Sequence, residues 1–186
     1  GYLGSKNYAF ETGRRALEDT LKRRNIRGRI LDNPRFSGYL TKYEADDYYV
    51  SIIIPMKDQA EISRRCFESI YAHNDSSKFE IIVIDNGSVK AETMSLFEEY
   101  QKKDNFKVIR IDSEFNYSML NNEGVRHASG DYLLFLNNDT EIIHDDTLDW
   151  MVGYASMDHC GCVGAKLLYP DHKVQHAGVV LGFGGV

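Results

Sequence analysis

A carboxylate follows directly on a short apolar run in the second half of the chain. Asn137, Asn138 and Asp139 come after Tyr132–Leu136, and the turn pair Gly130-Asp131 precedes that run. An apolar run of this length is too short for a helix and predicts a strand buried on both faces. Open α/β sheets bind ligands at the carboxyl ends of such strands. Asp139 is therefore our candidate ligand for a divalent cation.

Two further predicted strands also end in polar residues. Pro55-Met56-Lys57-Asp58 follows the strand that begins at Val50, and Asp85-Asn86-Gly87-Ser88 follows the strand that begins at Phe79. A single aspartate at such a position is commonplace, because aspartate caps helices. Three such ends, however, lie on the same edge of a parallel sheet. The pattern favours a cleft faced by carboxylates and amides.

Glycine-rich phosphate loops are missing from the chain. No G-x-G-x-x-G follows the first predicted strand and no Walker sequence occurs anywhere, which disfavours a Rossmann oxidoreductase. A hard divalent cation on oxygen ligands is the other means of neutralising a bound phosphate. We therefore expect Mg²⁺ or Mn²⁺ as the cofactor, held by few protein ligands when the diphosphate of a substrate supplies the rest.

Alternating strands and helices must position these residues. We predict strands at 50–54, 79–84, 106–111 and 132–136, with helices ending near residue 74, at about 91–102 and at 118–128 between them. Beyond these we predict a helix at 147–157, strands at 162–169 and 174–181, and a flexible glycine-rich end at 182–186. This alternation predicts an α/β fold with a mostly parallel sheet and right-handed crossovers.

We predict that the first 49 residues form a separate segment that precedes a domain over 50–186. Residues 1–30 predict a helix followed by a basic cluster, and 31–49 predict a partly extended linker. The basic cluster interacts favourably with the dipole at the end of the helix. The alternative is a contact with anionic lipid headgroups or a polyanionic acceptor. Its members are Lys22, Arg23, Arg24, Arg27 and Arg29.

Composition limits the remaining choices. The net charge of −6 over 186 residues excludes a general nucleic-acid binder, and no apolar run approaches the ~20 residues of a membrane span. There is no signal peptide and no initiator methionine, so we expect a fragment of a larger protein. Three cysteines fit reduced thiols in the cytoplasm, with peripheral contact at the inner face of the plasma membrane as a further option. Cys160-Gly161-Cys162 is either half a metal site or two thiols.

Six blocks in this order resemble glycosyltransferase family 2, in the bacterial branch that acts on O-antigens, rhamnans and other surface polysaccharides. The resemblance extends over about residues 50 to 186. The residues before it resemble the stretch that precedes this domain in large multi-domain members. The blocks are Val50–Pro55, Ile81–Ser88, Phe115–Asn122, Gly130–Glu141, Val163–Asp171 and Gln175–Gly182.

The resemblance implies a GT-A fold and an inverting transfer from a nucleotide-diphosphate-sugar to a glycan or lipid-linked glycan acceptor. It implies that the base and ribose are held by Pro55, Lys57, Asp85 and Asn86. The family's Asp-x-Asp motif falls on Asn137-Asn138-Asp139. This leaves Asp139 as the main metal ligand with Asn137 as a second one, Asn138 beside the nucleotide, and weak metal binding without nucleotide. Asn116 and Asn121 either reach the nucleotide or serve as helix-cap and loop residues.

An inverting transfer also needs a general base to deprotonate the acceptor hydroxyl. In the family this is an acidic residue further along, and we expect it beyond Val186. The late candidates within the chain are Asp171, otherwise a turn residue, and His176, otherwise a structural histidine in an apolar strand. A nucleotide-binding module without turnover is the alternative function. The oligomeric state stays open.

Overall fold

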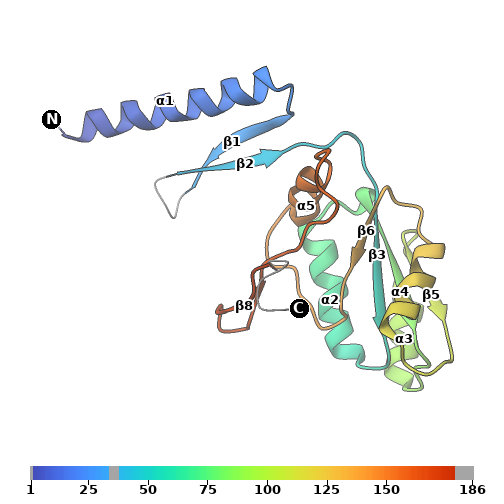
Figure 1. Ribbon diagram of the computed structural model, residues 1–186. Helices are drawn as coiled ribbons and strands as arrows, with labels where there is room; N and C mark the ends of the chain where they lie inside the picture. The colour runs from blue at the N-terminus through green and yellow to red at the C-terminus, as the bar shows by residue number, and fades with distance from the viewer. Residues whose placement is uncertain (1, 34–37, 179–186) are drawn as a thin grey trace, which may run out of the picture. The chain divides into compact units, whose positions relative to one another are not determined.

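A computed structural model describes residues 2–33 and 38–178 (Figure 1). The chain divides into two compact units. Unit 1 combines residues 1–45 with 149–186, and unit 2 comprises residues 46–148. The division expected between residues 49 and 50 stays a prediction.

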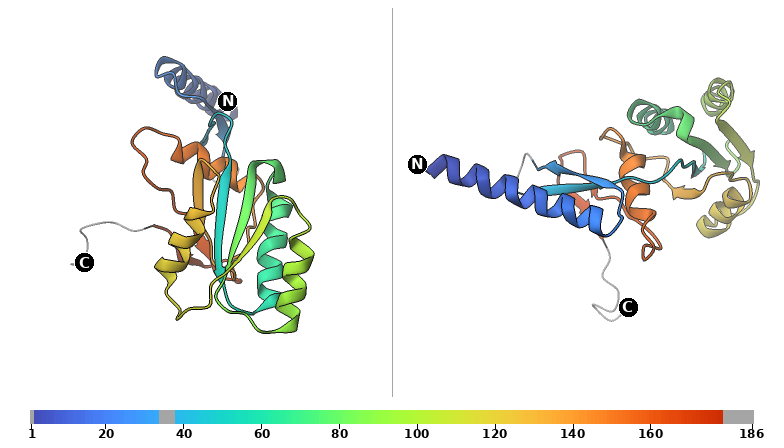
Figure 2. Two further views of the ribbon diagram at one scale, coloured as in Figure 1. Left: turned by 90° about the vertical axis from the view of Figure 1, so that its right-hand side faces the viewer. Right: turned by 90° about the horizontal axis from the view of Figure 1, so that it is seen from above.

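Unit 2 is built on a four-stranded parallel sheet. Its strands are β3 (Val50–Met56), β4 (Phe79–Asp85), β5 (Phe106–Arg110) and β6 (Tyr132–Phe135), in the order β5-β4-β3-β6. The connections carry α2 (Ala60–His73), the short 3-10 helix η1 (Ser76–Lys78), α3 (Ala91–Tyr100) and α4 (Tyr117–Arg126). Helices α2 and α3 cover one face of the sheet and α4 covers the other (Figure 2). The predicted α/β class with a mostly parallel sheet is confirmed.

The two central strands are buried on both faces, as their continuous β-branched runs predict. Under α4, Ile53, Ile82, Ile84 and Leu120 form one cluster. Gly124 lets α4 approach the sheet closely, because a Cβ there would lie 2.4 Å from Ile53 Cγ2. The opposite face carries an aromatic cluster with ring centroids about 5–6 Å apart, formed by Phe67, Tyr71, Phe79, Tyr100 and Phe106.

The prediction that β6 is buried on both faces is wrong. Leu133 and Phe135 are 42% and 48% exposed. The strand is at the edge of the sheet, where it pairs with β3 alone, and the register sets Leu133 beside Ser51 and Phe135 beside Ile53. These two side chains lie on the α4 face, but α4 packs over β3 and β4.

The amino ends of the strands are joined by a buried carboxylate. Glu80 is 2% exposed and accepts hydrogen bonds from Ser51 Oγ (2.8 Å), Lys107 Nζ (2.7 Å), and the amide and hydroxyl of Ser129 (2.7 and 2.6 Å). Gly130 fits close beside this network, because a Cβ there would lie 2.6 Å from the amide nitrogen of Ser51. Glu80 thereby ties β3, β4, β5 and the entry to β6 together.

Unit 1 contains α1 (Tyr2–Arg23), the antiparallel hairpin of β1 (Gly28–Asp32) and β2 (Tyr39–Tyr43), α5 (Thr147–Ala155), and the small antiparallel pair β7 (Leu167–Leu168) and β8 (Val174–His176). The linker expected over 31–49 is therefore wrong in part. The hairpin packs on α1, where Arg14 pairs with Asp32 and the rings of Phe10 and Tyr39 lie 4.6 Å apart.

The strand expected from Cys162 to Ala165 is also wrong. This stretch is mostly exposed and contains Gly161 and Gly164, and glycine weakens a strand interior. The part of the last predicted strand at 179–181 and the glycine-rich end at 182–186 lie outside the described residues. Among the helices that the structure describes, none is both long and apolar enough to cross a membrane.

Candidate functional site

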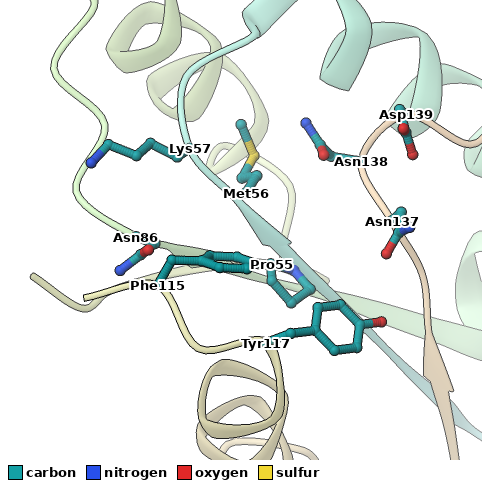
Figure 3. A pocket seen from close by; sticks show the side chains of 9 residues that line it. All are labelled: Pro55, Met56, Lys57, Asn86, Phe115, Tyr117, Asn137, Asn138 and Asp139. Carbon is teal, nitrogen blue, oxygen red and sulfur yellow. The ribbon is translucent and has the colours of Figure 1, made fainter. Parts of the chain in front are cut away.

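The carboxyl ends of β3, β4 and β6 meet at a cavity of about 360 Å³ (Figure 3). Six of the residues singled out in the sequence line it together, which is what parallel pairing of these strands predicts. The lining residues are Pro55, Met56, Lys57, Asn86, Phe115, Tyr117, Asn137, Asn138 and Asp139.

One wall carries the carboxylate. Asp139 is exposed, and no hydrogen bond or ion pair within the described residues involves its side chain. Asn137 is likewise exposed, whereas the Asn138 side chain donates through Nδ2 to Ser63 Oγ (2.9 Å). The described part of the chain contains no group of three acidic, histidine or cysteine residues that could hold a metal. Asp139 fits a cation whose remaining ligands come from a bound substrate.

The opposite wall carries a cation, Lys57, with Asn86 beside it (Figure 3). Lys57 is exposed and makes no hydrogen bond or ion pair within the described residues. Among the described residues, the cavity therefore has an ammonium without an ion pair on one side and a carboxylate without an ion pair on the other. An elongated anion with a divalent cation at one end matches this pair of charges.

Asp58 fixes the loop that carries Lys57. Its amide donates to Ser88 Oγ (2.7 Å), and its Oδ1 accepts from the amides of Val89 and Lys90 (both 3.0 Å). The hydrogen bonds from Lys90 and Val89 lower the pKa of Asp58. Its φ of 54° lies in the left-handed region, which asparagine and aspartate tolerate better than most residues. Asp58 thus clasps the loops after β3 and β4 together.

Replacing Asp58 by alanine should lower the midpoint of thermal unfolding by roughly 5 °C, because two amides at the start of α3 lose their acceptor and alanine tolerates the backbone poorly. The matched control is Asp58→Asn, which keeps the side-chain oxygen and the tolerance for positive φ. Circular dichroism melts of the three proteins measure the difference. Equal midpoints for the wild type and Asp58→Ala would refute the role of Asp58 in holding the two loops together.

Two aromatic side chains at the cavity were not singled out in the sequence as site residues. Phe115 is 72% exposed and Tyr117 is 45% exposed, and both line the cavity. Phe115 comes from the loop between β5 and α4, and Tyr117 is the first residue of α4. Exposed rings at a cavity offer a surface on which a planar ligand can stack. The available signal in the sequence was the pair of aromatic residues that flank Asn116 in an otherwise polar loop.

Asp85 and Asn86 have different surroundings. Asp85 is 2% exposed and accepts from the Ser88 amide (2.8 Å) and from Arg110 Nη1 (3.0 Å), and it does not line the cavity. Asn86 Nδ2 donates to the carbonyls of Ile111 and Ser113 (both 3.0 Å). These bonds fix the amide so that its oxygen remains to face a ligand. A nucleotide-binding role for Asp85 stays a prediction.

Asn116 precedes α4 and Asn121 lies within it, and neither is among the residues that line the cavity. Asn116 is the N-cap of the helix and accepts from the Met119 amide (2.9 Å). Asn121 donates to the Tyr117 carbonyl (2.9 Å), and its buried Oδ1 has no hydrogen-bond partner. Both side chains make the local bonds that the sequence offered as the alternative to nucleotide contact.

The two late candidates for the general base belong to unit 1. The Asp171 carboxylate pairs with Lys173 Nζ (2.6 Å), and this bond lowers the pKa of Asp171. His176 lies in β8, which is exposed along its whole length. The structural role expected for His176 as its ordinary one stays a prediction. A catalytic role for either residue stays a prediction.

The fold is that of GT-A glycosyltransferases. A mannosyltransferase of Pyrobaculum calidifontis, solved with GDP-Man and Mn²⁺, superposes with a TM-score of 0.55 at 17% identity over 83% of this chain and 43% of its own. GalNAc-T7, solved with UDP, GalNAc and Mn²⁺, gives 0.57 at 19% identity over 69% of this chain and 24% of its own. At these identities the likeness shows the fold alone.

The chain belongs to glycosyl transferase family 2, whose model matches residues 51–179. It is 42% identical to the uncharacterized protein y4gI of Sinorhizobium fredii over 98% of this chain and 20% of that protein. It is 37% identical to the O-antigen biosynthesis protein RfbC of Myxococcus xanthus over 95% of this chain and 14% of that protein. The chain thus spans a fifth or less of the length of these curated relatives.

Proposed function

We propose that the chain contains the donor-binding part of an inverting, divalent-metal-dependent glycosyltransferase. The donor is a nucleotide-diphosphate-sugar, and the acceptor is a hydroxyl of a bacterial cell-surface polysaccharide or a related glycan, free or lipid-linked. One observation carries the proposal. A single cavity presents Lys57 on one wall and Asp139 on the other, at the carboxyl edge of a parallel sheet.

In this proposal the lining residues divide the donor among them. The base lies against Phe115 and beside the side-chain oxygen of Asn86, while Lys57 faces the diphosphate. Asp139, with Asn137 as a second ligand, holds Mg²⁺ or Mn²⁺ on the diphosphate. When bound, the metal neutralises negative charge on the leaving nucleoside diphosphate.

The related proteins support these assignments. RfbC is named for O-antigen biosynthesis, which supports a surface polysaccharide as the acceptor. The Pyrobaculum mannosyltransferase and GalNAc-T7 were solved with a nucleotide or nucleotide-sugar and Mn²⁺, which supports the donor class and the metal. The free cysteines support a reducing, cytoplasmic location. We assign the general base to a residue outside the cavity wall, because Asp139, the one carboxylate that the described residues place in this wall, is assigned to the metal.

A panel of UDP-, dTDP- and GDP-sugars, each with Mn²⁺ or with EDTA, tests the donor assignment by thermal shift. At a hundredfold excess over its dissociation constant, the true donor should stabilise the fold by about 2.7 kcal/mol, or roughly 5–10 °C for a chain of this size. The shift should be largest for one base and should shrink in EDTA. NADH is the control and should give no shift.

Absence of a shift with every donor, or an equal shift in Mn²⁺ and EDTA, would contradict the proposal. Donor binding separates a glycosyltransferase from an oxidoreductase, but not from a binding module without turnover. A transfer assay with the full-length protein makes that second distinction. Release of the nucleoside diphosphate with retention of the sugar on the acceptor supports the enzyme.

A further inference from the structure

The irregular segment from residue 137 to residue 146, followed by the start of α5, lies along helix α2 and runs in the same direction as the helix. Side chains of α2 and of its C-cap residue Asn74 contact it at five places, the first two at its start and the other three progressively further along both. The contacts join Ser63 Oγ with Asn138 Nδ2 (2.9 Å), Cys66 Sγ with the Asn137 carbonyl (3.7 Å), Ser69 Oγ with the Ile142 amide (2.9 Å), His73 Nδ1 with Asp145 (2.7 Å) and Asn74 Oδ1 with the Leu148 amide (2.9 Å). Helix α2 therefore takes the place of a secondary structure of the segment's own.

The first two contacts belong to the turn that carries Asp139. Ser63 and Cys66 are separated by three positions, so they lie on the same side of α2 beneath this turn. Both are 0% exposed. The Cys66 thiol donates to the Asn137 carbonyl, with 3.7 Å between the sulfur and the oxygen. The turn is closed by a bond from the Thr140 amide to the same carbonyl (3.2 Å).

The Asp139 side chain has no partner within the described residues, whereas both residues before it are held by α2. The direction of its carboxylate is therefore set by its neighbours. We propose that Ser63 and Cys66 are positioning residues, which fix the turn so that Asp139 points into the cavity ready to bind the cation. This inference rests on the metal role proposed above, and it assigns a task to α2 residues that do not line the cavity.

The test is Mn²⁺ affinity measured by calorimetry in the presence of saturating UDP. Ser63→Ala should weaken Mn²⁺ binding about tenfold, within the 10- to 100-fold typical of residues that orient a metal ligand. UDP affinity in EDTA should stay unchanged. Asn138→Ala removes the same hydrogen bond from the accessible side and should give the same loss, even where the buried Ser63 variant folds poorly.

The matched control is Ser69→Ala, which removes an equivalent bond between α2 and the same segment, three residues beyond Asp139. A general loosening of the segment would weaken Mn²⁺ binding equally in Ser63→Ala and Ser69→Ala, and that result would overturn the inference. A double-mutant cycle adds a second readout. Ser63→Ala with Asn138→Ala should lose no more than either alone, because they share one bond, and independent losses would contradict the pairing.

Failure of this inference is distinguishable from failure of the proposed function. Tight Mn²⁺ binding in Ser63→Ala and in Asn138→Ala, together with its loss in Asp139→Ala, would remove the positioning role and leave the metal role intact. Unchanged Mn²⁺ binding in Asp139→Ala would remove both.

Discussion

Asp139→Ala is expected to lower the affinity for Mn²⁺ in the presence of UDP by more than about 100-fold, beyond the loss typical of residues that only orient a ligand. Among the described residues, Asp139 supplies the only carboxylate that lines the cavity. The remaining lining oxygens come from neutral amides and a phenol, which bind hard divalent cations less strongly than a carboxylate does. Without Asp139 the metal would be held almost entirely by the diphosphate. Calorimetric titration of Mn²⁺ measures the change.

Two substitutions at Asn137 serve as controls for this experiment. Asn137→Ala should cost much less than Asp139→Ala, because it removes a neutral ligand. Asn137→Asp should tighten Mn²⁺ binding in the absence of UDP, because it provides a second carboxylate on the same wall. Retention of wild-type Mn²⁺ affinity in Asp139→Ala would refute the metal role of this residue.

The second large effect concerns stability. Glu80→Ala should lower the free energy of unfolding by about 2–4 kcal/mol, because each buried donor that loses its acceptor costs about 1–3 kcal/mol. The substitution leaves Ser51, Ser129 and Lys107 without their common acceptor where three strands meet. Urea unfolding at pH 7 measures the loss. Glu99→Ala is the control, because Glu99 pairs with Arg64 at the surface, where ion pairs contribute little to stability.

The same residue predicts a pH dependence. Burial alone would raise the pKa of Glu80, but hydrogen bonds from Lys107, Ser129 and Ser51 outweigh it and lower the pKa from 4.5 to about 2. The fold therefore favours the ionised form. Its contribution is complete above the unfolded value near pH 4.5 and is lost as the pH falls towards 2. The stability difference between the wild type and Glu80→Gln should shrink over that interval, and a constant difference would contradict the assignment.

Much of unit 2 could be predicted because its strands have clear signals in the local sequence. The continuous β-branched runs of β3 and β4 indicate strands covered on both faces, and the polar residues after them mark one edge of the sheet. The exposure of Leu133 and Phe135 could not be predicted in the same way. An apolar run does not reveal which helix will cover it. Helix α4 packs over β3 and β4 and leaves these two side chains of β6 exposed.

The errors elsewhere have a similar cause, since they depend on partners distant in the sequence. The hairpin of β1 and β2 packs on α1 through Phe10 and Tyr39, a contact that no local pattern reveals. At the cavity, Phe115 was missed because nothing local sets its direction. Its loop is held in part by the bond from Asn86 to the Ser113 carbonyl. The anchoring of Asn138 on Ser63 joins positions 75 apart and has no local signature.

The position of β6 in the sheet has a consequence for how the chain folds. Ile52 pairs with Ile81, 29 positions later, but also with Leu134, 82 positions later. Closing the longer loop costs about 0.9 kcal/mol more conformational entropy in a flexible chain. Folding therefore favours early assembly of β3 with β4 and later arrival of β6, which brings Asp139 with it. The wall of the cavity with Lys57 and Asn86 belongs to the part that assembles early. The wall with Asp139 forms later, when β6 joins the sheet.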